Sequence, residues 1–121
     1  MNVLVDASVW IDHLHRADRE LIALLQRSEV AMHSAVLGEL ACGSLPNRQE
    51  FLSLWSVLPR ATEASAEEGL RLIDERRLWG NGLGWVDILL LGSALLSGVK
   101  LWTRDRPLLR VAKDLGLSFT N

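Results

Sequence analysis

Several features that would restrict the class of this protein are scarce or missing in its 121 residues. A single cysteine, Cys42, excludes an internal disulfide and suits a reducing compartment. No apolar run approaches the roughly 18 residues of a membrane-spanning helix. The N-terminus also lacks a basic segment followed by an apolar core, which is the signature of a signal peptide. We therefore expect a cytoplasmic protein with no membrane partner.

The chain has no excess of positive charge. Its formal net charge is −2, so any nucleic-acid partner has to be held by local basic groups. Hydrophobic residues make up 49% of the chain, enough to bury a core without disulfides or a structural metal. With no repeat or linker in the sequence, we expect one domain over residues 1–121.

Common cofactor motifs are absent as well. Gly80, Gly82 and Gly84 do not form a dinucleotide-binding fingerprint, because Trp85 replaces its third glycine and no strand precedes them. No phosphate-binding loop ends in Gly-Lys-Ser/Thr, and the three histidines lack zinc-ligand spacing. The chemistry of the chain therefore has to come from other residues.

Strands and helices are expected to alternate along the chain. Short apolar runs predict strands over residues 3–5, 29–33, 57–59, 99–103 and 117–119, the third of them weak. Helical spacing of apolar residues predicts helices after the capping residues Ser8, Asp18, Ser34, Asn47 and Ser65, and over 85–97 and 105–115. This alternation predicts an α/β fold with a parallel sheet of about four to five strands between helical layers.

Four carboxylates are placed to meet at one edge of that sheet. Asp6 and Asp105 follow strands directly, Glu39 lies early in a helix after a strand, and Asp87 lies in the first turn of its helix. Ligands of parallel sheets bind beyond the carboxyl ends of the strands. Each aspartate could instead serve only as a helix cap or a helix-dipole partner. Glu39 is harder to explain in that way, because its neighbours are apolar and we expect it to be buried.

Four acids with few cations beside them indicate a bound divalent metal. All-oxygen ligation suits Mg²⁺ or Mn²⁺, with one or two ions possible. Such ions activate water and neutralise charge on phosphodiesters. Without metal the carboxylates repel one another, which predicts a raised pKa for at least one of them.

Basic side chains lie on two of the predicted helices and just after the predicted strand 99–103. They are either solvated surface residues or contacts for a nucleic-acid backbone: Arg71, Arg76, Arg77, Arg104, Arg106, Arg110 and Lys113.

Four segments in order resemble the PIN-domain family, and specifically the VapC-type toxins of toxin–antitoxin pairs. They are Val3-Leu-Val-Asp-Ala-Ser-Val-Trp-Ile-Asp, Ser34-Ala-Val-Leu-Gly-Glu-Leu-Ala-Cys-Gly, Gly84-Trp-Val-Asp and Leu101-Trp-Thr-Arg-Asp. The likeness covers nearly the whole chain and implies the three-layer α/β/α fold of that family. Two departures are Ala7, where the family commonly has Thr, and Gly92, where it often has Ala.

The resemblance implies a Mg²⁺-dependent ribonuclease site. Asp6, Glu39, Asp87 and Asp105 would take the acidic roles, with Asp6, Asp87 and Asp105 as metal ligands. The resemblance also places Ser8 and Thr103 at small polar positions that orient acids or contact phosphate, and Arg104 beside them is a further phosphate-binding candidate. It further implies an RNA substrate such as tRNA or rRNA, a cognate VapB-type antitoxin and a homodimer.

Other functions fit the sequence less well. A PIN-like nuclease for RNA maturation or DNA ends remains possible, as does a non-catalytic protein-binding module. A phosphoacceptor receiver domain would need paired acids after the first strand, where only Asp6 stands. A haloacid-dehalogenase-like phosphatase would need Asp-x-Asp, where Ser8 occupies the second place.

Overall fold

The structure, a computed structural model, describes residues 1–120, so the predicted domain end at residue 121 lies outside the described residues. Three parallel strands form the sheet in the order β2-β1-β3. They are β1 (Val3–Val5), β2 (Val30–Ala31) and β3 (Lys100–Trp102). Strand β1 lies between the other two, with Val3 opposite Val30 on one side and Lys100 on the other.

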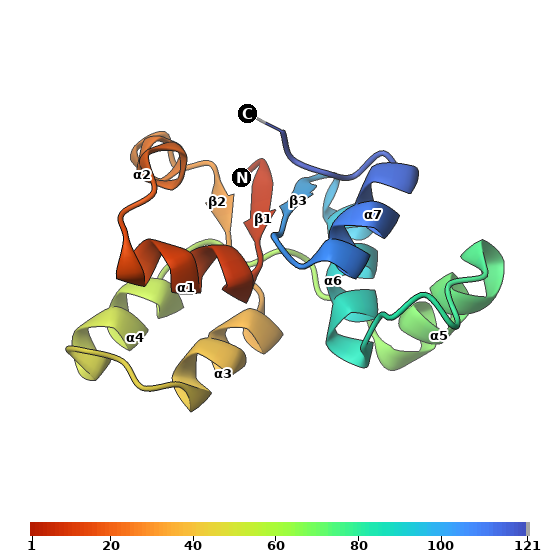
Figure 1. Ribbon diagram of the computed structural model, residues 1–121, viewed down its shortest axis with the longest axis horizontal. Coiled ribbons are helices and arrows are strands. Elements are labelled where there is room, and N and C mark those ends of the chain that lie inside the picture. The colour runs from red at the N-terminus through yellow and green to blue at the C-terminus, as the bar shows by residue number, and fades with distance from the viewer. Residues whose placement is uncertain (121) are drawn as a thin grey trace.

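Helices cover both faces of the sheet (Figure 1). On one side lie α1 (Ala7–His15), α2 (Arg19–Gln26), α3 (Ser34–Cys42) and α4 (Arg48–Ser56). On the other lie α5 (Ala66–Arg76), α6 (Trp85–Ser97) and α7 (Arg106–Asp114). The predicted three-layer α/β/α architecture is therefore confirmed. Burial on both faces explains why β1 consists only of Val and Leu, since a strand between two helical layers cannot alternate apolar and polar residues.

The sheet has fewer strands than the four to five that the sequence predicts. Residues 117–119 contribute one isolated bridge, between Leu101 and Ser118. The prediction of a strand over 57–59 is wrong: Val57 is the C-cap of α4 and is 79% exposed. Pairing resumes only at Arg60, which forms an isolated parallel bridge with Met32. The short apolar run after α4 resembles a strand in sequence, but it forms the end of the helix and the turn that follows.

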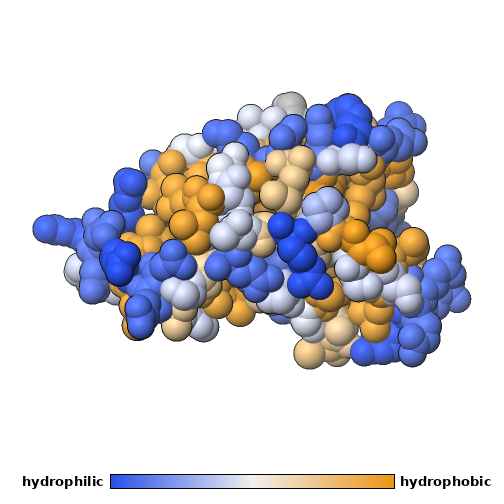
Figure 2. Space-filling model, turned by 180° about the vertical axis from the view of Figure 1, so that it is seen from behind, coloured by the Kyte–Doolittle hydropathy of each residue, from blue (hydrophilic) through white to orange (hydrophobic). Residues whose placement is uncertain are grey.

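Buried side chains form one hydrophobic core around the sheet. Its largest fully buried members come from β1, β3 and the helices on both sides, among them Leu4, Leu21, Leu90, Leu101 and Leu108. Seen from behind, hydrophobic residues on the surface are broken up by hydrophilic ones (Figure 2). None of the helices within residues 1–120 is both long enough and apolar enough to traverse a bilayer.

Gly92 in the middle of α6 has a packing reason. A Cβ atom added there would lie 3.0 Å from the Cβ of Ala64, closer than most real Cβ contacts. Glycine at this position lets the segment before α5 approach α6 closely. The departure from the family pattern therefore follows from local packing.

Candidate functional site

The structure brings the four predicted acids to the same edge of the sheet. Asp6 follows β1, Asp105 is the N-cap residue of α7 after β3, and Asp87 lies in the first turn of α6. Glu39 reaches the group from α3. The negative charges of Asp6 and Asp87 both act on Glu39, and those of Asp105 and Asp6 act on Asp87. The four side chains therefore share one electrostatic environment.

Asp6 is the buried member of the group, with 7% of its surface exposed. It occupies the N-cap position of α1, but its side chain makes no capping hydrogen bond. Instead its Oδ2 accepts hydrogen bonds from Ser8 Oγ at 2.7 Å and Thr103 Oγ1 at 2.8 Å. The capping interpretation of this side chain is therefore wrong, as is the prediction that Ser8 caps the helix: α1 begins at Ala7 and Ser8 orients Asp6.

The hydroxyls of Ser8 and Thr103 also connect Asp6 to Asp105. Ser8 Oγ accepts a hydrogen bond from the backbone N–H of Arg104 at 3.0 Å. Thr103 Oγ1 accepts one from the backbone N–H of Asp105 at 3.1 Å. The turn that carries Asp105 is thereby fixed relative to the carboxylate of Asp6. This agrees with the predicted role of Ser8 and Thr103 as residues that orient acids.

Asp87 and Asp105 each use one oxygen to close a helix N-terminus. Asp87 Oδ2 accepts a hydrogen bond from Gly84 N at 2.9 Å, and Asp105 Oδ2 accepts one from Leu108 N at 3.2 Å. The capping interpretation of Asp105 is thus correct for one of its oxygens, and Asp87 lies at a helix N-terminus as its helix-dipole interpretation requires. Among the hydrogen bonds within residues 1–120, none reaches Oδ1 of Asp6, Asp87 or Asp105. Each aspartate therefore keeps one oxygen available for a ligand.

Glu39 corrects one expectation from the sequence. Its side chain is exposed, although its neighbours along the chain are apolar. Val36 and Leu40 form the buried face of α3, and Glu39 lies on the flank of that face. Surrounding protein still displaces part of its hydration and raises the pKa of its carboxyl, and the charges of Asp6 and Asp87 raise that pKa further.

The pKa of Asp87 is raised as well. Burial is the main cause, and the negative charges of Asp105 and Asp6 add to it, while the hydrogen bond from Gly84 opposes it. The predicted raised pKa is therefore found in two of the four acids. In both cases burial contributes more than repulsion between carboxylates.

The donor set fits a hard divalent cation. It consists of carboxylate oxygens, which Mg²⁺ and Mn²⁺ prefer. Within residues 1–120 no three acidic, His or Cys side chains are yet gathered as tightly as a formed metal site requires. The oxygens that could ligate such an ion are those of the exposed Glu39 side chain and the Oδ1 atoms of the three aspartates, which accept no hydrogen bond within residues 1–120.

Arg104 is the remaining predicted site residue, and its side chain is engaged by two acids. Its guanidinium donates to Asp12 Oδ2 at 2.8 Å and to Asp18 Oδ2, and it lies 5.6 Å from the ring centroid of Trp102. These acids raise the pKa of Arg104 even though burial lowers it, while Asp18 has a lowered pKa because hydrogen bonds outweigh its burial. The sequence analysis missed Asp12 and Asp18 as its partners. One signal in the sequence was that Asp12 lies four residues after Ser8, which places both on the same face of α1.

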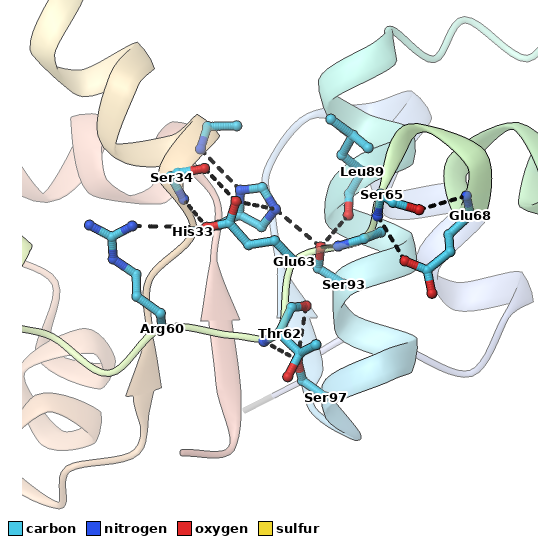
Figure 3. A network of polar contacts seen from close by, with 12 residues as sticks. His33, Ser34, Arg60, Thr62, Glu63, Ser65, Glu68, Leu89, Ser93 and Ser97 are labelled. Atoms are coloured by element: carbon cyan, nitrogen blue, oxygen red, sulfur yellow. Dashed lines mark hydrogen bonds and ion pairs between the residues drawn. The ribbon is translucent and has the colours of Figure 1, made fainter.

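A buried polar network fixes the helices that carry Glu39 and Asp87 (Figure 3). His33, the N-cap residue of α3, accepts a hydrogen bond at Nδ1 from Ala35 N at 3.0 Å. This requires the ring proton on Nε2, which lies 3.1 Å from Oγ of Ser93 in α6. Ser93 Oγ also accepts from Ala64 N and donates to Leu89 O, so all its hydrogen-bonding capacity is used.

Charged groups surround this network on its exposed side. Glu63 accepts hydrogen bonds from Ser34 N and Oγ. Its Oε1 lies 4.0 Å from His33 Nε2, and its Oε2 lies 3.9 Å from Nη1 of Arg60. Burial lowers the pKa of His33 more than Glu63 raises it, so the ring is neutral at pH 7. The sequence analysis named Ser34 as the cap of α3, whereas the structure has His33 in that position.

Known proteins with similar sequences or folds indicate the family of this chain. A family model described as "PIN domain" matches residues 3–114. "Ribonuclease VapC32" of Mycobacterium tuberculosis, in strains CDC 1551 and H37Rv, is 46% identical over 117 residues, covering 96% of this chain and 94% of that protein. The structure of PAE2754 from Pyrobaculum aerophilum matches with a TM-score of 0.61 at 21% identity, covering 91% of this chain and 78% of the other. That match supports the fold alone.

Proposed function

Since this chain belongs to the PIN-domain family and is a VapC-type member of it, we propose that it is a metal-dependent endoribonuclease toxin. The observation that carries the proposal is the set of four carboxylates at one sheet edge, each aspartate with one oxygen free. A relative of 46% identity is named a ribonuclease, which supports RNA as the substrate. By the same likeness we propose a VapB-type antitoxin as partner and a homodimer as the assembly.

Each residue of the site would have a separate role in metal binding or in positioning. Asp6, Asp87 and Asp105 would hold Mg²⁺, or Mn²⁺ in its place, through their free oxygens, and Glu39 would complete the group. A bound ion would supply activation of water and neutralisation of charge on the phosphodiester. Ser8 and Thr103 keep Asp6 in place. Burial and the neighbouring carboxylates raise the pKa of Glu39 and that of Asp87 in the metal-free protein.

Arg104 has a narrower role in this proposal. Its ion pairs with Asp12 and Asp18 fix the turn between β3 and α7, which carries Thr103 and Asp105. Any phosphate contact by Arg104 would use the part of the guanidinium that these acids leave exposed. We therefore propose that the main role of Arg104 is to position this turn.

The RNA target is tested by mapping where cuts occur. Purified protein incubated with total cellular RNA and Mg²⁺ should give a discrete set of fragments, and sequencing their new 5′ ends should place the cuts in one tRNA or rRNA. Structured RNA is expected because specificity then comes from RNA shape and unstacked bases. Cuts spread evenly over mRNA would contradict the proposed target class.

Metal binding is expected to stabilise the folded protein in a pH-dependent way. The raised pKa values of Glu39 and Asp87 mean that the folded, metal-free protein holds protons that the unfolded chain releases, so stability falls as pH rises from about 4 through the raised values. A bound cation offsets the repulsion between the carboxylates, and it binds only carboxylates that are ionised. Mg²⁺ at ten times the Kd that it has at pH 8 should add about 1.4 kcal/mol at that pH. The same Mg²⁺ concentration should raise the melting temperature less at pH 5, where protons compete for the carboxylates.

Thermal unfolding with and without Mg²⁺ measures this effect. Asp87→Asn should abolish the shift, whereas the matched control Asp74→Asn, an exposed acid on α5, should retain it. An equal Mg²⁺ shift in both variants would show that the ion does not bind at the four acids.

A further inference from the structure

Helix α7 presents a row of cations that leads away from the acidic site. Arg106, Arg110 and Lys113 are exposed and recur at intervals of four and three residues, which places them on one face of the helix. They line a shallow hollow of about 270 Å³ together with Leu109 and Asp114. None of the three cations forms an ion pair with another side chain in the described part of the chain.

The row continues onto the end of α5. Arg110 also lines a second hollow, of about 260 Å³, together with Arg76, Leu78 and Asn81. Arg76 is likewise exposed and makes no ion pair within residues 1–120. Four cations from two helices thus line two hollows that share Arg110.

The charge of this part of the chain differs from that of the whole. Residues 76–114 contain seven Lys or Arg and three acids, Asp87, Asp105 and Asp114, although the chain as a whole has a net charge of −2. Asp87 and Asp105 belong to the proposed metal site, while Asp114 lines both hollows. A metal ion held at the site would offset the charge of Asp87 and Asp105 and leave this surface with a net positive charge.

The row starts at the site itself. Arg106 directly follows Asp105, the N-cap of α7, and at 1.5 Å per residue Lys113 lies about 12 Å further along the helix. At about 3.4 Å per nucleotide of a stacked strand, this length matches roughly three to four phosphates. An RNA strand with one bond at Asp105 could therefore place its neighbouring phosphates along α7.

We propose that Arg76, Arg106, Arg110 and Lys113 form a phosphate-binding row that holds the RNA strand beside the acidic site. This inference rests on the proposed ribonuclease function and names the surface that takes the substrate. The row supplies charge rather than base contacts, so it adds affinity without sequence preference. It also resolves how a chain of net charge −2 can bind RNA.

The test compares two triple variants that lose the same charge. One removes the row on α7 (Arg106→Gln, Arg110→Gln and Lys113→Gln), and the control removes exposed cations elsewhere (Arg16→Gln, Arg19→Gln and Arg48→Gln). Both are made in the full chain carrying Asp6→Asn, so that RNA stays intact. Binding of a fluorescein-labelled single-stranded RNA 20-mer is followed by anisotropy with Mg²⁺ between 50 and 200 mM salt, after circular dichroism has shown that each variant folds.

The row variant should bind at least tenfold more weakly at 50 mM salt. Its slope of log affinity against log salt should fall by about 2, from about 0.7 for each of three lost phosphate contacts. The control should stay within twofold of the parent in affinity. In the chain with Asp6 restored, the row variant should raise KM for cleavage while kcat is retained.

Equal affinities and slopes for the two triple variants would overturn the row and assign this surface to another partner, such as an acidic protein segment. That result is distinguishable from failure of the proposed function, in which the protein with Asp6 restored binds RNA through the row but leaves it uncut.

Discussion

Asp6→Asn is expected to reduce kcat/KM for RNA cleavage about a thousandfold, which corresponds to about 4 kcal/mol of lost transition-state stabilisation. The amide oxygen of asparagine can take the place of Oδ2 and keep the hydrogen bonds from Ser8 and Thr103. The amide nitrogen then replaces the free Oδ1, where it cannot ligate a metal and adds no negative charge. The fold should therefore survive while the site loses its buried ligand. Initial rates on a defined RNA substrate measure the effect.

Two further variants separate loss of the ligand from loss of its orientation. Thr103→Val removes one hydrogen bond to Asp6 but leaves the carboxylate, so we expect a smaller loss of about 10–100-fold. Asp74→Asn makes the same chemical change on the exposed surface of α5 and should leave the rate unchanged. If a folded Asp6→Asn protein cleaved RNA at the parent rate, Asp6 would not be a metal ligand in catalysis.

Ser93→Ala is expected to lower the free energy of unfolding by about 3 kcal/mol, or the melting temperature by roughly 10 °C. Ser93 is fully buried, and its hydroxyl accepts hydrogen bonds from His33 Nε2 and from Ala64 N. Alanine would leave both donors without an acceptor, one buried at His33 and one partly buried at Ala64. A buried donor without an acceptor costs about 1–3 kcal/mol. Denaturant unfolding of the two proteins gives the difference directly.

Ser97→Ala is the matched control for this substitution. Ser97 lies one turn further along α6, where its hydroxyl pairs with the exposed backbone of Thr62. Water can replace that partner, so the expected loss is below about 1 kcal/mol. Equal losses for the two serines would mean that the buried network does not stabilise the contact between α3 and α6.

The acidic edge of the sheet could be predicted because it depends on chain order alone. Asp6 directly follows β1 and Asp105 lies three residues after the end of β3, and parallel strands end at the same edge. The capping box of Ser65 and Glu68 was predictable for a similar reason, because both of its hydrogen bonds join residues three apart. Local patterns of this kind do not need knowledge of the rest of the fold.

Features that depend on tertiary contacts could not be predicted in the same way. Glu39 was expected to be buried, but the face of α3 that turns inward is set by packing against other elements. Val57 and Leu58 read as a strand, although the buried side chain of Trp55 keeps this segment in and just beyond α4. Asp12 and Asp18, the partners of Arg104, and Ser93, the buried partner of His33, lie 60 or more residues away along the chain.

The most direct test of the metal-dependent ribonuclease site is cleavage of total cellular RNA by metal-stripped protein with and without added Mg²⁺. The protein is treated with EDTA, dialysed, freed of any inhibitor and checked for folding before RNA is added. We expect no cleavage until Mg²⁺ is returned, then one discrete set of fragments that the Asp6→Asn protein fails to produce. Cleavage that persists at full rate in excess EDTA would contradict a metal site at the four acids.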